Sequence, residues 1–293
     1  MKRISFSFFS WQNLAGNRRL FLLCFVLFII SACLSFGVFF PADVLQQRLL
    51  QEVSQKTGLK LYGRNAEMVF PPGFRMDLTV FHDIPELVEA EFTGLRISPV
   101  WSSLFSGRPE VSLSGKIAGG DIDLDAGQNG HINLDLEDVT LGPLQRPDLP
   151  YRVDGKLSGN LDCQNISAEM TGRGVFSFFL ENMQVTGAAL TMLGLPKSIS
   201  AGELHLTGKF DQRRISLEQV LLVGGDLELS GGGNILIGET AEQTRLNLNI
   251  RLHPTSTTPD NFREFLKMTG LRPTVDGSYL LRVGGTVAKP LIR

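Results

Sequence analysis

Apolar and polar residues alternate strictly along much of the chain after residue 58. The alternation is clearest in segments 111–114, 122–125, 132–136, 204–207, 227–230 and 246–250. Successive side chains of an extended strand point to opposite faces, so each segment predicts a strand with one apolar and one polar face. Glycine-containing turns between the segments predict antiparallel hairpins. We therefore predict a mainly-β fold, an elongated and curved antiparallel sheet with a few short helices.

Glycine recurs at the ends of these predicted strands. Segments that end at Gly115, Gly155, Gly208 and Gly285 are each followed by a turn and a further strand. The spacing is too irregular for a solenoid repeat, and it indicates a long sheet in which glycines provide bends and close turns. No Lys-Ser/Thr pair follows 231–233, so this Gly-Gly-Gly run is not a phosphate loop, and we interpret it as a turn between two strands.

Three segments have helical features instead. Asp43 and Gln46 form a possible capping box, and apolar residues at four-residue spacing continue to Gly58, which predicts a helix of about 14 residues. This helix either covers one end of the following domain, which we favour, or lies on a membrane. Ser98-Pro99 predicts the start of a second helix that ends at Gly107, and Thr258-Pro259-Asp260 the start of a third that ends at Gly270. Segment 187–196 is either a short helix or an apolar loop.

The N-terminal region contains 21 consecutive uncharged residues, 20–40. At about 1.5 Å per residue, such a helix spans the roughly 30 Å hydrocarbon core of a bilayer. Arg18 and Arg19 precede the run, and Pro41 and Asp43 follow it, so the positive-inside rule places the N-terminus in the cytoplasm. We predict a cytoplasmic segment 1–19, a transmembrane anchor 20–40 in the inner membrane, and a periplasmic β-rich domain 41–293.

A second interpretation concerns the sequence Ile30-Ser31-Ala32-Cys33, which has the form of a lipoprotein processing box. Cleavage there would leave lipid on Cys33 and a tethered rather than membrane-spanning protein. The residues after Cys33 continue the apolar run, whereas a lipoprotein has a polar tether at this point. The pattern therefore favours the anchor.

Charge and cysteine content limit the classes of function. Residues 1–40 contain four basic and no acidic side chains, whereas the remaining 253 residues contain 24 basic and 30 acidic ones. An acidic body argues against nucleic-acid binding. Cys24 and Cys33 lie in the apolar run and only Cys163 lies in the body, so the body has no internal disulfide.

Six polar residues in two neighbouring predicted strands could bind Ca²⁺: Asp121, Asp123, Asp125, Asn133, Asp135 and Glu137. An EF-hand requires a glycine at the sixth loop position and a terminal glutamate, and neither is in register here. We interpret these residues as the solvated face of the two strands.

Catalytic signatures are missing from the sequence. The four histidines, His82, His131, His205 and His253, are scattered one per region without the spacing of zinc ligands. His131 and His205 fall on the polar phase of alternating segments, which predicts solvent-facing positions. There is no G-x-S-x-G motif, and Cys163 has no catalytic signature around it. We therefore predict no catalytic, cofactor-binding or metal-binding residue, and a protein that is not an enzyme.

The predicted sheet has too little helix to cover its apolar face. A partner protein, a second sheet or lipid acyl chains must cover that face instead.

Several segments, in their order along the chain, resemble a known family. These are 70–80, 95–107, 111–124 and 285–290. Together with the N-terminal anchor, they resemble the type II secretion system protein N (GspN) family, in the form in which it overlaps the AsmA-like family.

The resemblance implies an inner-membrane protein whose periplasmic body belongs to, or accompanies, the machine that exports folded proteins across the outer membrane. Its partners are then other type II secretion subunits. The AsmA-like side implies instead a β-groove that binds or moves lipid. Neither family offers catalytic residues, and the chain is far shorter than the large AsmA-type proteins, which argues against a bridge between two membranes.

Overall fold

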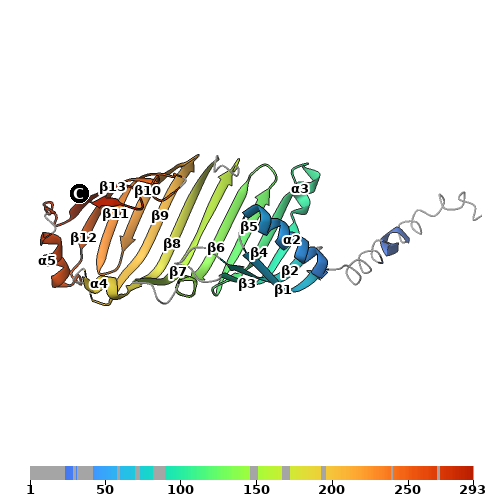
Figure 1. The fold of residues 1–293 in the computed structure, drawn as a ribbon, viewed down its shortest axis with the longest axis horizontal. Helices are drawn as coiled ribbons and strands as arrows, with labels where there is room; N and C mark the ends of the chain where they lie inside the picture. Colours follow the sequence, from blue (N-terminus) through green and yellow to red (C-terminus); the bar gives the residue numbers. More distant parts are fainter. Residues whose placement is uncertain are drawn as a thin grey trace, which may run out of the picture.

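The computed structural model shows one antiparallel sheet of 14 strands whose spatial order equals their order in the chain (Figure 1). The structure describes residues 24–28, 31, 42–57, 60–69, 73–81, 90–145, 151–166, 172–192, 196–238, 240–268 and 271–292. Every strand pairs with its neighbours in sequence, as the predicted hairpins require. The mainly-β, antiparallel prediction is confirmed.

The elements have the following bounds. The strands are β1 (Lys60–Val69), β2 (Gly73–Phe81), β3 (Ala90–Pro99), β4 (Glu110–Ile117), β5 (Gly120–Gly127), β6 (Ile132–Thr140), β7 (Arg152–Gln164), β8 (Arg173–Thr186), β9 (Ser198–Asp211), β10 (Arg214–Val223), β11 (Leu227–Leu236), β12 (Arg245–Pro254), β13 (Tyr279–Gly285) and β14 (Pro290–Ile292). The helices are α2 (Ala42–Thr57), α3 (Trp101–Phe105), α4 (Ala188–Met192) and α5 (Asp260–Met268), with a 3₁₀ turn η2 (Gly142–Leu144).

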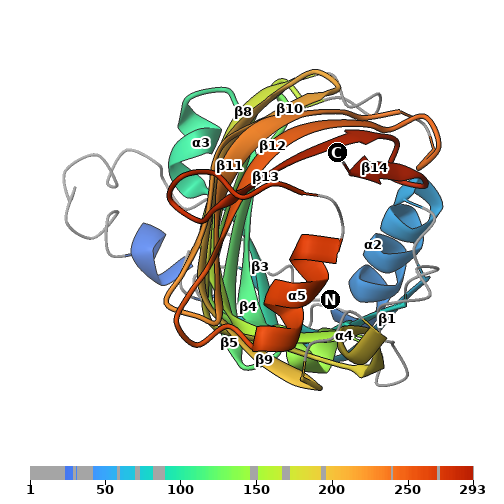
Figure 2. The same cartoon turned by 90° about the vertical axis from the view of Figure 1, so that its left-hand side faces the viewer.

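The sheet bends around its long axis into a trough, which is seen end-on in Figure 2. Neighbouring strands lie about 4.8 Å apart, so 14 strands give a trough about 60 Å long. Helices α2 and α5 lie on the inner side of the bend, towards opposite ends of the sheet (Figures 1 and 2).

Strand register places one apolar residue or glycine from every strand in a single line along the trough. We call this line the central row: Met68, Phe74, Ile97, Leu113, Leu124, Leu134, Leu161, Phe176, Gly208, Leu217, Gly233, Leu248, Val283 and Ile292. Because side chains alternate between faces, aligning one such residue per strand puts the remaining apolar positions on the same face. That face is the concave one, because its residues pack against α2 and α5.

Polar residues at positive φ mark several β-bulges. Asn65, Asp138 and Asn182 have φ values of 55°, 56° and 52°, and each lies where the register shifts between two strands. Asp77 links two such irregularities, because its carboxylate accepts hydrogen bonds from the Asn65 side chain (2.7 Å) and the Gly94 backbone N–H (2.8 Å). These bonds, the Gly94 one foremost, lower the pKa of Asp77. Bulges increase the local twist and bend of a strand, so they contribute to the curvature of the trough.

Glycines within the strands make room for aromatic rings. A Cβ atom at Gly208 would lie 2.5 Å from Cζ of Phe176, and one at Gly159 would lie 2.7 Å from Cδ1 of Phe178. The two rings are stacked with centroids 5.9 Å apart. Rings that lie across glycines of adjacent strands fill the space that the missing side chains leave.

Four sequence interpretations need correction. Gly115, Gly155 and Gly208, which we predicted to end strands before turns, lie inside β4, β7 and β9. The Gly-Gly-Gly run 231–233 lies inside β11, where Gly231 and Gly233 face apolar partners in β10 and β12, and so it is not a turn. Ser98 and Pro99 end β3, and the following helix α3 begins two residues after Pro99 without a side-chain cap. Helix α2 begins at Ala42, so the predicted cap residue, Asp43, lies within it. The segment 187–196, left open as helix or loop, contains α4.

The predicted anchor 20–40 and cytoplasmic segment 1–19 lie mostly outside the described residues. Residues 24–28 are helical and expose Phe25, Val26, Leu27 and Phe28 by 47–71%. Among the described residues, no helix has the length and apolar character needed to cross a membrane. Of the lipoprotein box, only Ser31 is described, so that alternative also falls outside the described part.

Packing at Gly208 predicts a stability difference between two glycine substitutions. The Gly208→Ala variant places Cβ 2.5 Å from the Ser216 carbonyl oxygen as well as the Phe176 ring, and we expect a loss of about 1–3 kcal/mol in the free energy of unfolding. In Gly284→Ala, Cβ meets nothing closer than 3.9 Å, so we expect a change within about 0.5 kcal/mol. Urea unfolding followed by circular dichroism measures both, and equal effects would contradict the packing described.

Candidate functional site

The concave face of β4–β11 is an apolar floor. Beside the central row runs a second row, Gly115, Ile122, Leu136, Gly159, Phe178, Leu206, Val220 and Gly231, and beyond it a third, Val111, Ala126, Ile132, Cys163, Gly174, Phe210, Ile215 and Ile235. None of the three rows contains a charged or hydrogen-bonding polar side chain other than the thiol of Cys163. We call the residues of these rows in β4–β11 the trough floor.

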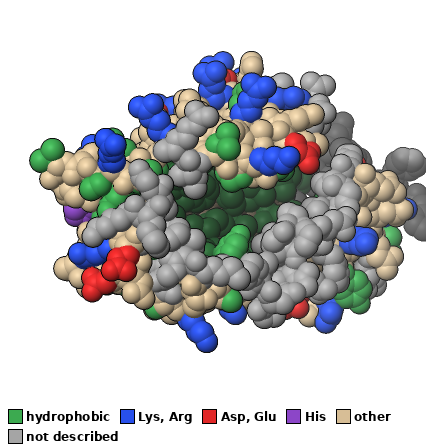
Figure 3. Space-filling model, turned by 60° about the vertical axis from the view of Figure 1, so that its left-hand side comes forward, with side chains coloured by type: hydrophobic (Ala, Val, Ile, Leu, Met, Phe, Trp, Pro, Cys, Tyr) green, Lys and Arg blue, Asp and Glu red, His purple; other side chains and the backbone are tan. Residues whose placement is uncertain are grey.

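Much of the trough floor is only half-buried. Leu113, Leu134 and Leu161 retain intermediate exposure, as do Phe176 and Leu217. Figure 3 shows the corresponding hollow, whose visible wall is apolar. Half-exposed apolar side chains that form a continuous surface indicate a surface that binds something apolar.

Helix α2 covers the concave face at the β1 end of the sheet. Leu50 packs with Phe74 and Leu95, which are 4% and 1% exposed. Gln46 is buried against β1 at Gly63, where a Cβ atom would lie 2.0 Å from the Gln46 side-chain nitrogen. The prediction that this helix covers one end of the domain is confirmed.

Helix α5 covers the concave face at the opposite end of the sheet. Phe262 and Leu266 pack on Leu252 and Tyr279, which are 7% and 5% exposed, with Leu190 of α4 beside them. The two covered ends therefore differ from the half-exposed middle, which no described helix covers.

Hydrogen bonds hold α5 to the rim of the sheet. The Thr255 and Thr258 hydroxyls both donate to the carbonyl oxygen of Asp226, the first at 2.9 Å. The Asp226 carboxylate accepts a hydrogen bond from the Ser200 backbone N–H at 3.0 Å, and the Arg263 guanidinium donates to the Thr255 carbonyl. These bonds make α5 a fixed end of the trough.

Cys163 lies in the third row of the floor as a free thiol. Its side chain is buried, and burial raises its pKa, as does the charge of Asp162 to a smaller extent. A buried thiol with a raised pKa stays protonated, so it lacks the thiolate character of a nucleophile.

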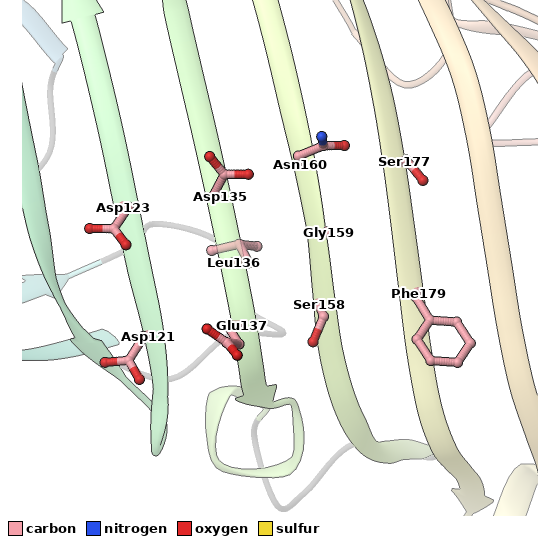
Figure 4. Close-up of a pocket in the computed structure, with 10 residues that line it drawn as sticks. All are labelled: Asp121, Asp123, Asp135, Leu136, Glu137, Ser158, Gly159, Asn160, Ser177 and Phe179. Atoms are coloured by element: carbon pink, nitrogen blue, oxygen red, sulfur yellow. The ribbon is translucent and has the colours of Figure 1, made fainter.

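The predicted acidic residues lie on the opposite, convex face. Register pairs Asp121 with Glu137 and Asp123 with Asp135, and these four line a shallow hollow together with Ser158, Asn160 and Ser177 (Figure 4). Asp125 pairs with Asn133 in the same way. The interpretation as a solvated face is confirmed, because Asp121 and Asp123 are exposed and Asp125 is half-exposed. In the described part of the chain, no group of three or more His, Cys, Asp or Glu side chains has an arrangement that could hold a metal ion.

The described histidines lie apart from one another. His131 and His205 lie on the convex face with side chains 32% and 42% exposed, as predicted. The His131 Nε2 lies 3.5 Å from Asp162 Oδ1, and the His205 ring contacts Phe179 at 4.3 Å between centroids. His82 lies outside the described residues.

The structure brings together one group that sequence reasoning missed, His253, Asp276 and Ser278. The Ser278 hydroxyl donates to Asp276 at 2.8 Å, and His253 Nδ1 lies 3.4 Å from the same hydroxyl oxygen. Hydrogen bonds from Thr274, and then from Ser278, lower the pKa of Asp276. A catalytic triad needs the carboxylate on the histidine and an accessible serine. Here the carboxylate binds the serine, which is 1% exposed, so the group ties β12 to the loop before β13. His253 and Ser278 lie 25 positions apart in the chain, which leaves no sequence motif that could reveal the contact.

Comparisons with known proteins give no relative: no family model, no curated protein and no solved structure matches this chain.

Because α5 packs on the concave face at the β13 end, we predict unequal effects of two neighbouring alanine substitutions. Phe262→Ala removes a 7%-exposed ring from the apolar cluster, and we expect a loss of about 3–5 kcal/mol in the free energy of unfolding. Asn261→Ala changes an exposed residue of the same helix turn, and we expect a change within about 0.5 kcal/mol. Urea unfolding distinguishes the two. Similar small effects would show that α5 does not cover this end of the concave face.

Proposed function

We propose that the protein is a non-catalytic, membrane-anchored envelope protein that binds lipid acyl chains in its trough. The observation that carries this proposal is the charge-free floor of β4–β11, which lies half-exposed between two helix-covered ends. A polar or charged ligand would find no hydrogen-bonding partner on this floor, whereas a hydrocarbon chain needs none.

The dimensions of the floor support an acyl-chain ligand. Strands β4–β11 are eight strands, so the floor is about 34 Å long at 4.8 Å per strand spacing. The hydrocarbon core of a bilayer, two acyl chains end to end, is about 30 Å thick. The uncovered floor thus accommodates chains lying along the trough axis, with headgroups at its open side.

Energetics favour exchange with a membrane. Removing apolar surface from water contributes roughly 25 cal/mol per Å², so half-exposed floor residues gain from any hydrocarbon that covers them. A lipid already in a bilayer gains little from the apolar contact itself, because its chains leave one apolar environment for another. Binding in the trough is therefore reversible, which suits a carrier or a reservoir.

The two faces of β8 offer a matched test in the full-length protein. We replace either Phe176, on the floor, or Phe179, on the convex face, with the photoreactive analogue p-benzoylphenylalanine and irradiate cells grown with radioactive phosphate. We expect a labelled phospholipid adduct from position 176 and none from 179, because only the first lies where acyl chains bind.

A second pair of variants tests the floor itself. Leu161 pairs with Phe176 in the central row, and Asn160 is its neighbour on the convex face. Leu161→Asp puts a carboxylate against hydrocarbon at a cost of several kcal/mol, and we expect adduct formation at 176 to fall at least about tenfold. Asn160→Asp leaves it unchanged. Lipid adducts from both faces, or from neither, would contradict the proposal.

The ordered resemblance to the GspN family supports a second proposal, in which the protein is a component of type II secretion and the trough receives an apolar segment of another subunit. Deleting the gene is then expected to reduce the amount of enzyme secreted, measured in culture supernatants, and the Asn160→Asp variant to restore it. Unchanged secretion in the deletion strain, with lipid adducts at position 176, refutes this role and leaves the lipid-binding one.

A further inference from the structure

Helix α3, between β3 and β4, presents aromatic side chains to solvent. Phe105 is 92% exposed and Trp101 is 46% exposed. Exposed aromatic side chains on one short helix form an apolar surface that the protein does not bury against the rest of its described residues.

Hydrogen bonds fix the conformation of this turn. Ser103 is 6% exposed, and its hydroxyl donates to the Val100 carbonyl (2.6 Å) and accepts from the Glu110 backbone N–H (2.9 Å). The Ser103 carbonyl in turn accepts bonds from the Ser106 hydroxyl at 2.7 Å and the Arg108 N–H at 3.3 Å. These hydrogen bonds fix the turn in a conformation in which Trp101 and Phe105 are exposed to solvent.

The position of α3 brings it near the point where the chain enters the body. Helix α3 lies at the β1 end of the sheet, the end that also carries α2 and residues 24–28 (Figure 1). Only Pro41 separates α2 from the predicted anchor 20–40. An anchored chain therefore keeps the β1 end of the sheet, which carries α3, as the end nearest the membrane.

We propose that α3 inserts Trp101 and Phe105 into the interfacial layer of the membrane in which the chain is anchored. This inference rests on the proposed membrane attachment. Tryptophan is enriched at membrane interfaces, where its ring meets acyl chains and its N–H meets water or headgroups. Exposed Arg108, next to the turn, can pair with lipid phosphates.

The small area of the exposed aromatic surface favours a membrane over a protein as the partner of α3. A stable protein interface buries about 800 Å² on each partner. Two aromatic side chains provide at most about 500 Å², which is too little for such an interface and enough for an interfacial contact that assists an anchor. Docked in this way, α3 holds the β1 end of the trough against the bilayer from which lipid is drawn.

Tryptophan fluorescence tests the contact in the full-length chain. The protein has two tryptophans, Trp11 and Trp101, so Trp11→Phe leaves Trp101 as the only emitter. The variant is reconstituted into vesicles of phosphatidylcholine and phosphatidylglycerol, with or without phosphatidylcholine brominated in the upper part of its acyl chains, and the vesicles are floated. We expect brominated lipid to remove most of the Trp101 emission and Phe105→Ser to weaken this quenching.

A matched control uses Tyr151, a 51%-exposed residue before β7 in the middle of the sheet. In a chain with Trp11→Phe, Trp101→Phe and Tyr151→Trp, we expect no quenching. The Leu161→Asp substitution is expected to remove lipid from the trough floor. If Trp101 is quenched by lipid of the membrane, the substitution leaves the quenching of its fluorescence unchanged.

The outcomes separate this inference from the proposed function. If the protein floats with the vesicles and brominated lipid does not quench Trp101, the membrane contact is overturned. If the Trp101 emission is also shifted to the blue, the tryptophan is buried against protein instead. Quenching that Leu161→Asp abolishes also overturns it, because the quencher is then lipid in the trough. Protein that fails to float overturns both the anchor and the contact.

Discussion

In this sheet, the pairing register between neighbouring strands decides which side chains face the concave side and which face the convex side. Because side chains alternate with a period of two, a slip of one residue between any two strands would move every apolar residue of the next strand to the wrong face. Fourteen consecutive strands keep the register, so that one line from Met68 to Ile292 holds only apolar residues and glycine. The apolar floor and the charged convex face are both consequences of this alignment.

The curvature of the sheet turns its aligned apolar face into a concave binding surface. Bulges at Asn65, Asp138 and Asn182 bend individual strands, and in-strand glycines make room for the Phe176 and Phe178 rings. The bend brings the apolar face inward, where α2 and α5 each bury one end of it. Between the two helices, the three described rows of the trough floor contain no charged side chain, so the chemistry of this surface is that of a hydrocarbon environment.

The outer side of the sheet has a different character. Carboxylates that face one another across strands, such as Asp121 and Glu137, repel, and they are tolerated because water and neighbours such as Lys116, 3.1 Å from Asp121, reduce the repulsion. Such a face stays solvated. The exposed aromatics Trp101 and Phe105 belong to α3, which lies at the end where the chain arrives from its N-terminal region.

Alternation along the sequence was sufficient to predict the antiparallel β fold, the solvated acidic face, the outward positions of His131 and His205, and the helix that covers one end, because these depend on local periodicity. Local patterns failed at 231–233, where three glycines suit a turn equally well, and only pairing with Leu248 and Ile250 places them inside a strand. The His253–Ser278 contact and the helix-covered ends likewise depend on residues far apart in the chain. Alternation along the chain is therefore enough to give the body one apolar face. That this face is concave, with a helix over each end and a half-exposed middle, follows from three-dimensional packing, because bulges, ring-on-glycine packing and long-range helix docking set the curvature.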